Sequence, residues 1–255
     1  MKKIIEFIKN RIGNEPETAI VLGSGLSELY KILKNRITIN YNDIPNFFNT
    51  SVEGHKGKFV IGDYKNKRII FALGRFHFYE GLSIDEVGLP IRIFKELNCK
   101  NIILTNSSGC LNKNWNLGDI MIINGHADFT FRNLKSNPTI NKNPKIYNQS
   151  LINTALSIDS SIKIGNYGWV IGPMYETRAE IANMIKCNVS AVGMSTVPEL
   201  LMAGKIKINI LGLALMSNYG VGLTDENLTH STVLKNSEKY NEKFKSFLIK
   251  LILRI

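Results

Sequence analysis

Short apolar segments alternate with helix-like segments along the chain, and most of them run into a turn of glycine or small polar residues. The segments 19–22, 101–105 and 189–192 show this arrangement, and a longer apolar segment covers 206–216. Apolar segments of about four to eight residues are typical of strands buried on both faces. Alternation with helices predicts an α/β fold with a largely buried sheet. Without a repeat or linker, residues 1–255 are expected to form one domain.

Local sequence signals place further helices, strands and turns. The β-rich segments 58–64 and 68–73 flank a Lys-Asn-Lys turn, which predicts a hairpin. Capping-box patterns at 83–86 and 177–180 each mark the start of a helix. The segment 129–149 contains two prolines and many asparagines, and it predicts a long loop. Helices are also expected at the N-terminus, over 26–33, over 85–97, up to 186 and from 229 to the end, and a strand over 119–124.

Composition excludes several classes of protein. Apolar residues make up 44% and charged residues 21%, which is ordinary for a globular chain. The net charge of +11 comes from scattered lysines and arginines with no run of five, so a nucleic-acid partner is not expected. The apolar segments are too short to cross a bilayer, so no membrane association is expected. Three cysteines without a CxxC pair predict neither a disulfide frame nor a zinc site, and they favour a reducing, cytoplasmic location.

The first strand runs into Gly23-Ser24-Gly25 and then into a helix-like segment. Glycines let backbone N–H groups face one point, and a hydroxyl adds a further donor, so this turn could cradle an anion. It matches neither the dinucleotide-binding fingerprint nor the P-loop. Taken alone, the motif fits an ordinary structural turn equally well.

The segment 74–81, Gly-Arg-Phe-His-Phe-Tyr-Glu-Gly, is more informative. Alternation in an extended chain places Arg75, His77 and Tyr79 on one face. The guanidinium of Arg75 is suited to binding phosphate. Glu80 does not share the face of these three residues, and it could orient His77. A solvated strand edge is the alternative interpretation.

Other strand ends carry polar or aromatic side chains. Ser107 follows one strand, and Met194 and Ser195 follow another. Tyr175 and Glu176 precede a capped helix, where an aromatic face beside a carboxylate suits a purine, although Glu176 could simply favour the positive helix end. We expect the strand-end residues to meet at one edge of the sheet, where open α/β sheets bind ligands. They include Ser24, Arg75 and Asn218. Asn218 carries both a donor and an acceptor.

Eight motifs, taken in order, resemble the trimeric purine nucleoside phosphorylases, the family that includes methylthioadenosine phosphorylase. The resemblance runs from about residue 19 to the final helix. The most specific motifs are GRFHFYEG at 74–81 and VGMSTVPE at 192–199. The others are VLGSGL at 21–26, IPNF at 44–47, GHKG at 54–57, TNSSG at 105–109, GDIM at 118–121 and GPMYET at 172–177.

The resemblance implies a fold and a set of site residues. The fold would be α/β, with a twisted, mixed, partly barrel-like sheet surrounded by helices, in a homotrimer. The implied phosphate-binding residues are Ser24, His55, Arg75, His77, Ser107 and Ser195. The implied ribose-binding residues are Tyr79, Met194 and His230, and the implied base-binding residues are Tyr175, Glu176 and Asn218. Of these, His77, Glu176 and Asn218 would take part in catalysis, and His126 is expected to be structural.

The implied reaction is phosphorolysis of inosine or guanosine to a free base and ribose 1-phosphate. Inorganic phosphate is the co-substrate, and neither a metal nor another cofactor is expected. Glu176 with Asn218 accompanies 6-oxopurines in the family, whereas the methylthioadenosine branch has an aspartate in place of the asparagine. Alternatives are methylthioadenosine phosphorolysis, nucleic-acid binding, or nucleoside binding without turnover.

Three stretches depart from the family pattern. Ser107, Ser108 and Cys110 replace part of a run of small residues and glycines. The segment 129–149 is shorter than in mammalian-type members, and no aromatic residue donated across the subunit interface can be assigned in it. The segment 219–227, before His230, also differs.

Overall fold

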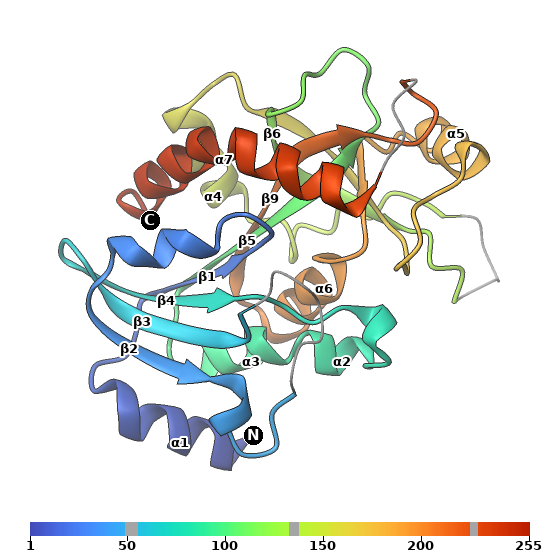
Figure 1. The fold of residues 1–255 in the computed structure, drawn as a ribbon. Helices are drawn as coiled ribbons and strands as arrows, with labels where there is room; N and C mark the ends of the chain where they lie inside the picture. The colour runs from blue at the N-terminus through green and yellow to red at the C-terminus, as the bar shows by residue number, and fades with distance from the viewer. Residues whose placement is uncertain (49–55, 133–137, 225–228) are drawn as a thin grey trace.

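The computed structural model describes residues 1–48, 56–132, 138–224 and 229–255 and shows a mixed sheet surrounded by helices (Figure 1). Within these residues the sheet has nine strands in the order β2-β3-β4-β1-β5-β8-β7-β6-β9. Their bounds are β1 Thr18–Leu22, β2 Lys34–Asn40, β3 Lys58–Tyr64, β4 Lys67–Leu73, β5 Asn101–Cys110, β6 Ile120–Asp128, β7 Lys163–Trp169, β8 Ala191–Gly193 and β9 Asn209–Tyr219.

The last five strands in that order form a closed barrel, because β9 also pairs with β5. β1 lies between β4 and β5 and is parallel to both, and β9 is parallel to β5. The carboxyl ends of these four strands therefore lie at one edge of the sheet. The expected twisted, mixed and partly barrel-like sheet is confirmed.

The described helices pack around this sheet (Figure 1). Their bounds are α1 Lys2–Ile12, α2 Ile84–Val87, α3 Leu89–Glu96, α4 Gln149–Ile158, α5 Arg178–Lys186, α6 Val197–Ile206 and α7 His230–Ile252. The 3₁₀ helices are η1 Ser27–Ile32, η2 Tyr41–Asp43 and η3 Phe78–Glu80. One buried apolar cluster extends from Ile4 to Ile252. None of the helices in the described ranges is long and apolar enough to cross a membrane.

Several expected boundaries were wrong. The helix expected over 26–33 is the shorter 3₁₀ helix η1, Ser27–Ile32. The helix expected over 85–97 is divided at Gly88, where a Cβ would lie 2.7 Å from Cβ of Met202. The strand expected from 206 begins at Asn209, because Ile206 still belongs to α6.

Candidate active site

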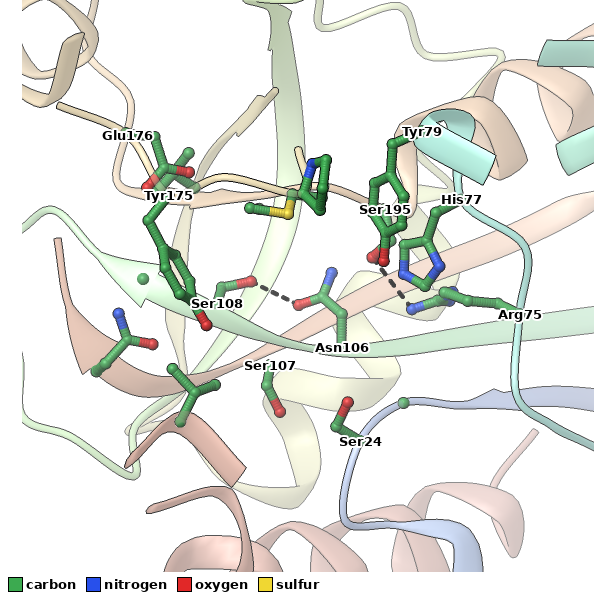
Figure 2. Close-up of a pocket in the computed structure, with 18 residues that line it drawn as sticks. Ser24, Arg75, His77, Tyr79, Asn106, Ser107, Ser108, Tyr175, Glu176 and Ser195 are labelled. Atoms are coloured by element: carbon green, nitrogen blue, oxygen red, sulfur yellow. Dashed lines mark hydrogen bonds between the residues drawn. The ribbon is translucent and has the colours of Figure 1, made fainter. Parts of the chain in front are cut away.

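The glycine turn after β1 rests on the middle of β5, because this strand continues past Thr105, where it was expected to end, to Cys110. The Gly23 N–H donates to Thr105 Oγ1 at 2.9 Å, and that hydroxyl donates to the carbonyl of Val21. A Cβ on Gly23 would lie 2.7 Å from the Thr105 carbonyl oxygen, so the close approach requires glycine. The following residue, Ser24, lines a cavity at this edge (Figure 2).

Arg75 enters the cavity from the end of β4 and is held by three neighbours. Its Nε and Nη2 donate to one carboxylate oxygen of Glu199 at 3.3 and 3.2 Å. Its Nη1 donates to the Thr105 carbonyl at 2.6 Å and lies 3.4 Å from Ser195 Oγ. Arg75 is 2% exposed and Glu199 is 1% exposed, so this ion pair is buried. The guanidinium is thereby fixed before any ligand binds.

Ser195 is presented by a strained turn between β8 and α6. Thr196 has φ +76° and ψ −44°, and the Val197 N–H donates to the Ser195 carbonyl at 2.9 Å. This is a γ-turn of the rare, strained kind, at a β-branched residue for which positive φ is a real outlier. Asn106 Nδ2 donates to Thr196 Oγ1 at 2.7 Å and holds the turn in place. Strain of this kind is concentrated at functional sites.

His77 and Tyr79 lie beside Arg75, although the chain turns into η3 after His77 (Figure 2). The two rings stack at 4.9 Å between centroids. One oxygen of Glu80 accepts from the His77 backbone N–H at 2.6 Å and lies 3.3 Å from its Nδ1, so the predicted contact with Glu80 is present. Desolvation, together with the charge of Glu80, raises the pKa of Tyr79 to about 12, so the phenol is protonated at neutral pH.

Tyr175 and Glu176 lie at the other end of the cavity (Figure 2). Burial is the main cause that raises the pKa of Glu176 above its usual value. Its neighbour Thr177 caps α5 with both capping-box bonds to Glu180. The cap fixes the chain direction just after these two cavity-lining residues.

Asn218 reaches the same cavity from the end of β9. Its Oδ1 accepts from Ser217 Oγ at 2.9 Å, and its Nδ2 donates to the Tyr219 carbonyl at 3.0 Å. These contacts fix the orientation of the amide. Gly109 packs beside the amide, and a Cβ there would lie 3.1 Å from Val192 Cγ1 and 3.4 Å from Asn218 Nδ2.

The cavity has a volume of about 440 Å³ and brings together nearly all the predicted site residues. Those that line it are Ser24, Arg75, His77, Tyr79, Ser107, Tyr175, Glu176, Met194, Ser195 and Asn218. His55 and the side chain of His230 lie outside the described residues, although His230 begins α7. His126 lies away from this cavity, buried beside Tyr147.

The sequence interpretation missed the residues that hold the site from behind. Glu199 looks like an ordinary acid in the first turn of a helix, and its partner Arg75 is 124 positions away. Asn106 lies within a predicted motif, but nothing local shows that its amide reaches Thr196. No cluster of three or more histidine, cysteine, aspartate or glutamate side chains suitable for a metal occurs in the ranges covered by the structure.

Comparison with known proteins gives consistent similarities. Residues 17–253 match the family model described as the phosphorylase superfamily. Purine nucleoside phosphorylase 1 of Geobacillus stearothermophilus is 35% identical over 269 residues, which cover 100% of this chain and 96% of the relative. Purine nucleoside phosphorylase of Mus musculus is 33% identical, over 93% of this chain and 89% of the relative.

Solved structures give the same result. Schistosoma mansoni purine nucleoside phosphorylase in complex with inosine has a TM-score of 0.88 at 32% identity, covering 100% of this chain and 95% of that one. Isoform 2 from the same organism, in complex with cytosine and ribose-1-phosphate, has a TM-score of 0.89 at 31% identity and the same coverage.

Proposed function

Since this chain belongs to the phosphorylase superfamily, we propose that it is a purine nucleoside phosphorylase that cleaves inosine and guanosine, and their deoxy forms, with inorganic phosphate. The observation that carries the proposal is that Arg75 and Asn218 line one cavity. Donors suited to an oxyanion lie at one end of it, and an aromatic ring with a buried carboxylate lies at the other. The named activities of the relatives support the same reaction.

At the phosphate end, Ser24, Arg75, His77, Ser195 and the Ser107 backbone would bind the co-substrate. Because Glu199 and Thr105 already hold the guanidinium, little reorganisation is needed when phosphate binds. The bound phosphate would lie under C1′ of the sugar, oriented for attack. His55, which lies outside the described residues, is proposed to approach the phosphate as well.

The sugar and base would occupy the remaining length of the cavity. Tyr79 and Met194 would contact the ribose, and His230 would reach its 5′-hydroxyl. Tyr175 would stack on the purine. Glu176 would accept hydrogen bonds from N1–H and an exocyclic amine, which would compensate for the water that its carboxylate has lost.

In the reaction, a phosphate oxygen forms a bond to C1′ while the bond from C1′ to the purine nitrogen breaks. The sugar passes through an oxocarbenium-like state, and the bonding electron pair moves into the purine. Asn218, with its amide orientation fixed, would stabilise the departing base at N7 and O6. The products would be ribose 1-phosphate, inverted at C1′, and the free base. Phosphate is the co-substrate, and this route uses no further cofactor.

We propose that the protein acts as a homotrimer in the cytoplasm in purine salvage. The three widely spaced cysteines fit a reducing compartment. Light scattering of the purified protein would test the trimer: a mass of about 28.7 kDa at micromolar concentration would contradict it.

The function is tested by following base release from inosine, guanosine, adenosine and methylthioadenosine, with and without phosphate. The expected result is phosphate-dependent release from inosine and guanosine, with slower release from the 6-amino substrates. Folded protein without turnover on any of them would contradict the proposal. Faster turnover of methylthioadenosine than of inosine would favour methylthioadenosine phosphorylase instead.

A further inference from the structure

Helix α7 touches a turn and a strand at the phosphate end of the cavity through two buried polar side chains. Ser237 Oγ donates to Ser107 Oγ at 3.0 Å. Asn241 Nδ2 donates to the Gly25 carbonyl at 2.7 Å. Ser237 is 0% exposed and Asn241 is 2% exposed, whereas their partners Ser107 and Gly25 are half-buried, so both contacts are part-buried. One helix thus contacts the glycine turn after β1 and the polar part of β5.

The spacing of these residues places them on one face of α7. Val233, Ser237 and Asn241 are four residues apart and lie one above another on the helix. Val233 lines the cavity itself, so the same face of α7 runs from the cavity to the contacts with Ser107 and Gly25. α7 also packs along β9, which carries Asn218 (Figure 1).

The contact with the glycine turn is close. Gly25 has φ +79°, and a Cβ there would lie 2.2 Å from Asn241 Nδ2. The amide therefore lies directly against the backbone of the turn. The hydrogen bond from Asn241 to the Gly25 carbonyl is short, and it leaves the turn little freedom to move away from the cavity.

Stability alone does not explain a polar pair at this place. Further along α7 the buried face is apolar, with Phe244, Leu248 and Leu251. Asn241 Oδ1 is buried without a hydrogen-bond partner among the described residues. A buried polar atom without a partner is unfavourable, and an apolar residue of similar shape would avoid it. The amide is instead placed where it can fix the Gly25 carbonyl.

We propose that Ser237 and Asn241 are positioning residues for phosphate, holding Ser107 and the Gly23–Gly25 turn in the geometry that binds the anion. The proposal rests on the proposed function, since it assigns the phosphate subsite of that reaction. Neither side chain lines the cavity, so each acts through the residue that it contacts. Loss of either contact would loosen the donors for phosphate while leaving Tyr175 and Glu176 in place.

The test compares Ser237→Ala, Asn241→Ala and Asn241→Asp with the wild-type chain. Asn241→Asp keeps the volume but removes the donor to Gly25. Matched controls on the same helix are Asn236→Ala, which is part-exposed, and Ser246→Ala, which is exposed. For each variant, KM for phosphate, KM for inosine, kcat, and the Kd for inorganic phosphate by calorimetry are measured.

The expected result is a rise of about fivefold to twentyfold in KM and Kd for phosphate in the three test variants, as loss of a buried hydrogen bond predicts. KM for inosine should change less than about twofold, and the two controls should match wild type. Equal rises in both KM values, or an unchanged phosphate Kd in folded Ser237→Ala and Asn241→Asp, would overturn the proposal.

The two proposals fail in different ways. A wild-type chain that binds phosphate but does not cleave nucleosides contradicts the proposed function. The phosphate Kd values of the variants then still test the positioning role. A wild-type chain that binds no phosphate overturns both. If Asn241→Ala does not fold, the phosphate Kd values of Ser237→Ala and Asn241→Asp test the proposal. Failure of all three variants to fold would show a structural role and contradict the proposal.

Discussion

The Arg75–Glu199 pair shows how a single charge is prepared for a ligand. Glu199 Oε2 is buried and has no hydrogen-bond partner among the described residues, so the carboxylate accepts hydrogen bonds from Arg75 only through Oε1. Buried ion pairs rarely contribute net stability, because desolvation of both charges offsets their attraction. The pair is better explained by the fixed direction that it gives to the guanidinium.

This explanation predicts an asymmetry in stability. Glu199→Ala leaves the Arg75 charge buried and unpaired, so it should lower the free energy of unfolding by about 3–5 kcal/mol. Replacing both partners, as Arg75→Met with Glu199→Leu, should recover most of that loss while phosphorolysis stays abolished. Urea unfolding measures the first effect and the phosphate-dependent assay the second.

The exposed pair between Lys205 and Asp85 provides the control, since it involves the same helix as Glu199. Lys205→Ala should cost less than about 1 kcal/mol. If Glu199→Ala costs no more than Lys205→Ala, the buried pair is not what fixes the guanidinium.

Asn218 is the residue on which base choice should depend. Asn218→Ala removes the donor and acceptor proposed to contact the purine, so kcat with inosine should fall about 5–150-fold, corresponding to about 1–3 kcal/mol. KM for inosine should change less, because the contact would strengthen as the base departs. Asn218→Asp should shift the ratio of kcat/KM values toward 6-aminopurine nucleosides. A variant altered only in KM would exclude the leaving-group role.

At the scale of elements, the cap of α5 connects local helix chemistry to the base end of the cavity. Thr177 Oγ1 accepts from the Glu180 N–H, and Glu180 accepts from the Thr177 N–H at 2.7 Å. Thr177→Ala should lower the free energy of unfolding by about 0.5–2 kcal/mol. Because Tyr175 and Glu176 immediately precede the cap, KM for nucleoside should also rise. Urea unfolding and steady-state kinetics measure these effects.

Ser83→Ala is the matched control, because Ser83 forms the same kind of capping box at α2 but does not line the cavity. Its cost in stability should be similar, with KM for nucleoside unchanged. Equal effects of both variants on that KM would mean that the α5 cap has no special relation to the base.

The strands that the sequence analysis predicted are those with an apolar pattern, such as β1, β3 and β4. β2 was missed because it is mostly exposed and polar. β7 was missed because it contains Gly165 and Gly168, which have no apolar side chain to show the pattern. In the barrel, Cβ atoms at these glycines would lie 2.8 Å from Ser190 and 3.0 Å from Val189. The reason for these glycines is a tertiary contact that no local pattern contains.

The site shows the same division between local and distant information. Residues that line the cavity belong to compact motifs in or after strands and before α5, so they could be predicted. Glu199, Ser237 and Asn241 act through partners more than 100 positions away. Only the fold, which brings β1, β4 and β5 close to α6 and α7, makes those pairings visible.

At the scale of the whole molecule, the closed barrel includes β6, which carries a buried histidine away from the cavity. His126 is 4% exposed, and its Nδ1 contacts the hydroxyl of Tyr147. Desolvation lowers the pKa of His126 from 6.5 to about 4, and the nearby charge of Asp128 opposes this only partly. The folded protein therefore binds fewer protons at this site than the unfolded chain does between those two pH values.

The sign of the pH effect follows from that difference. Above pH 6.5 both states hold a neutral imidazole, and as the pH falls the unfolded state gains a proton first, so the folded protein loses stability. At pH 5 the titration of His126 alone should lower the free energy of unfolding by about 2 kcal/mol relative to pH 7. His126→Gln should remove that part of the loss, whereas Tyr147→Phe should keep it, because burial is the main cause. Urea unfolding at both pH values, at one protein concentration, measures the differences. An equal loss in wild type and His126→Gln would show that other groups, and not this histidine, set the acid stability of the barrel.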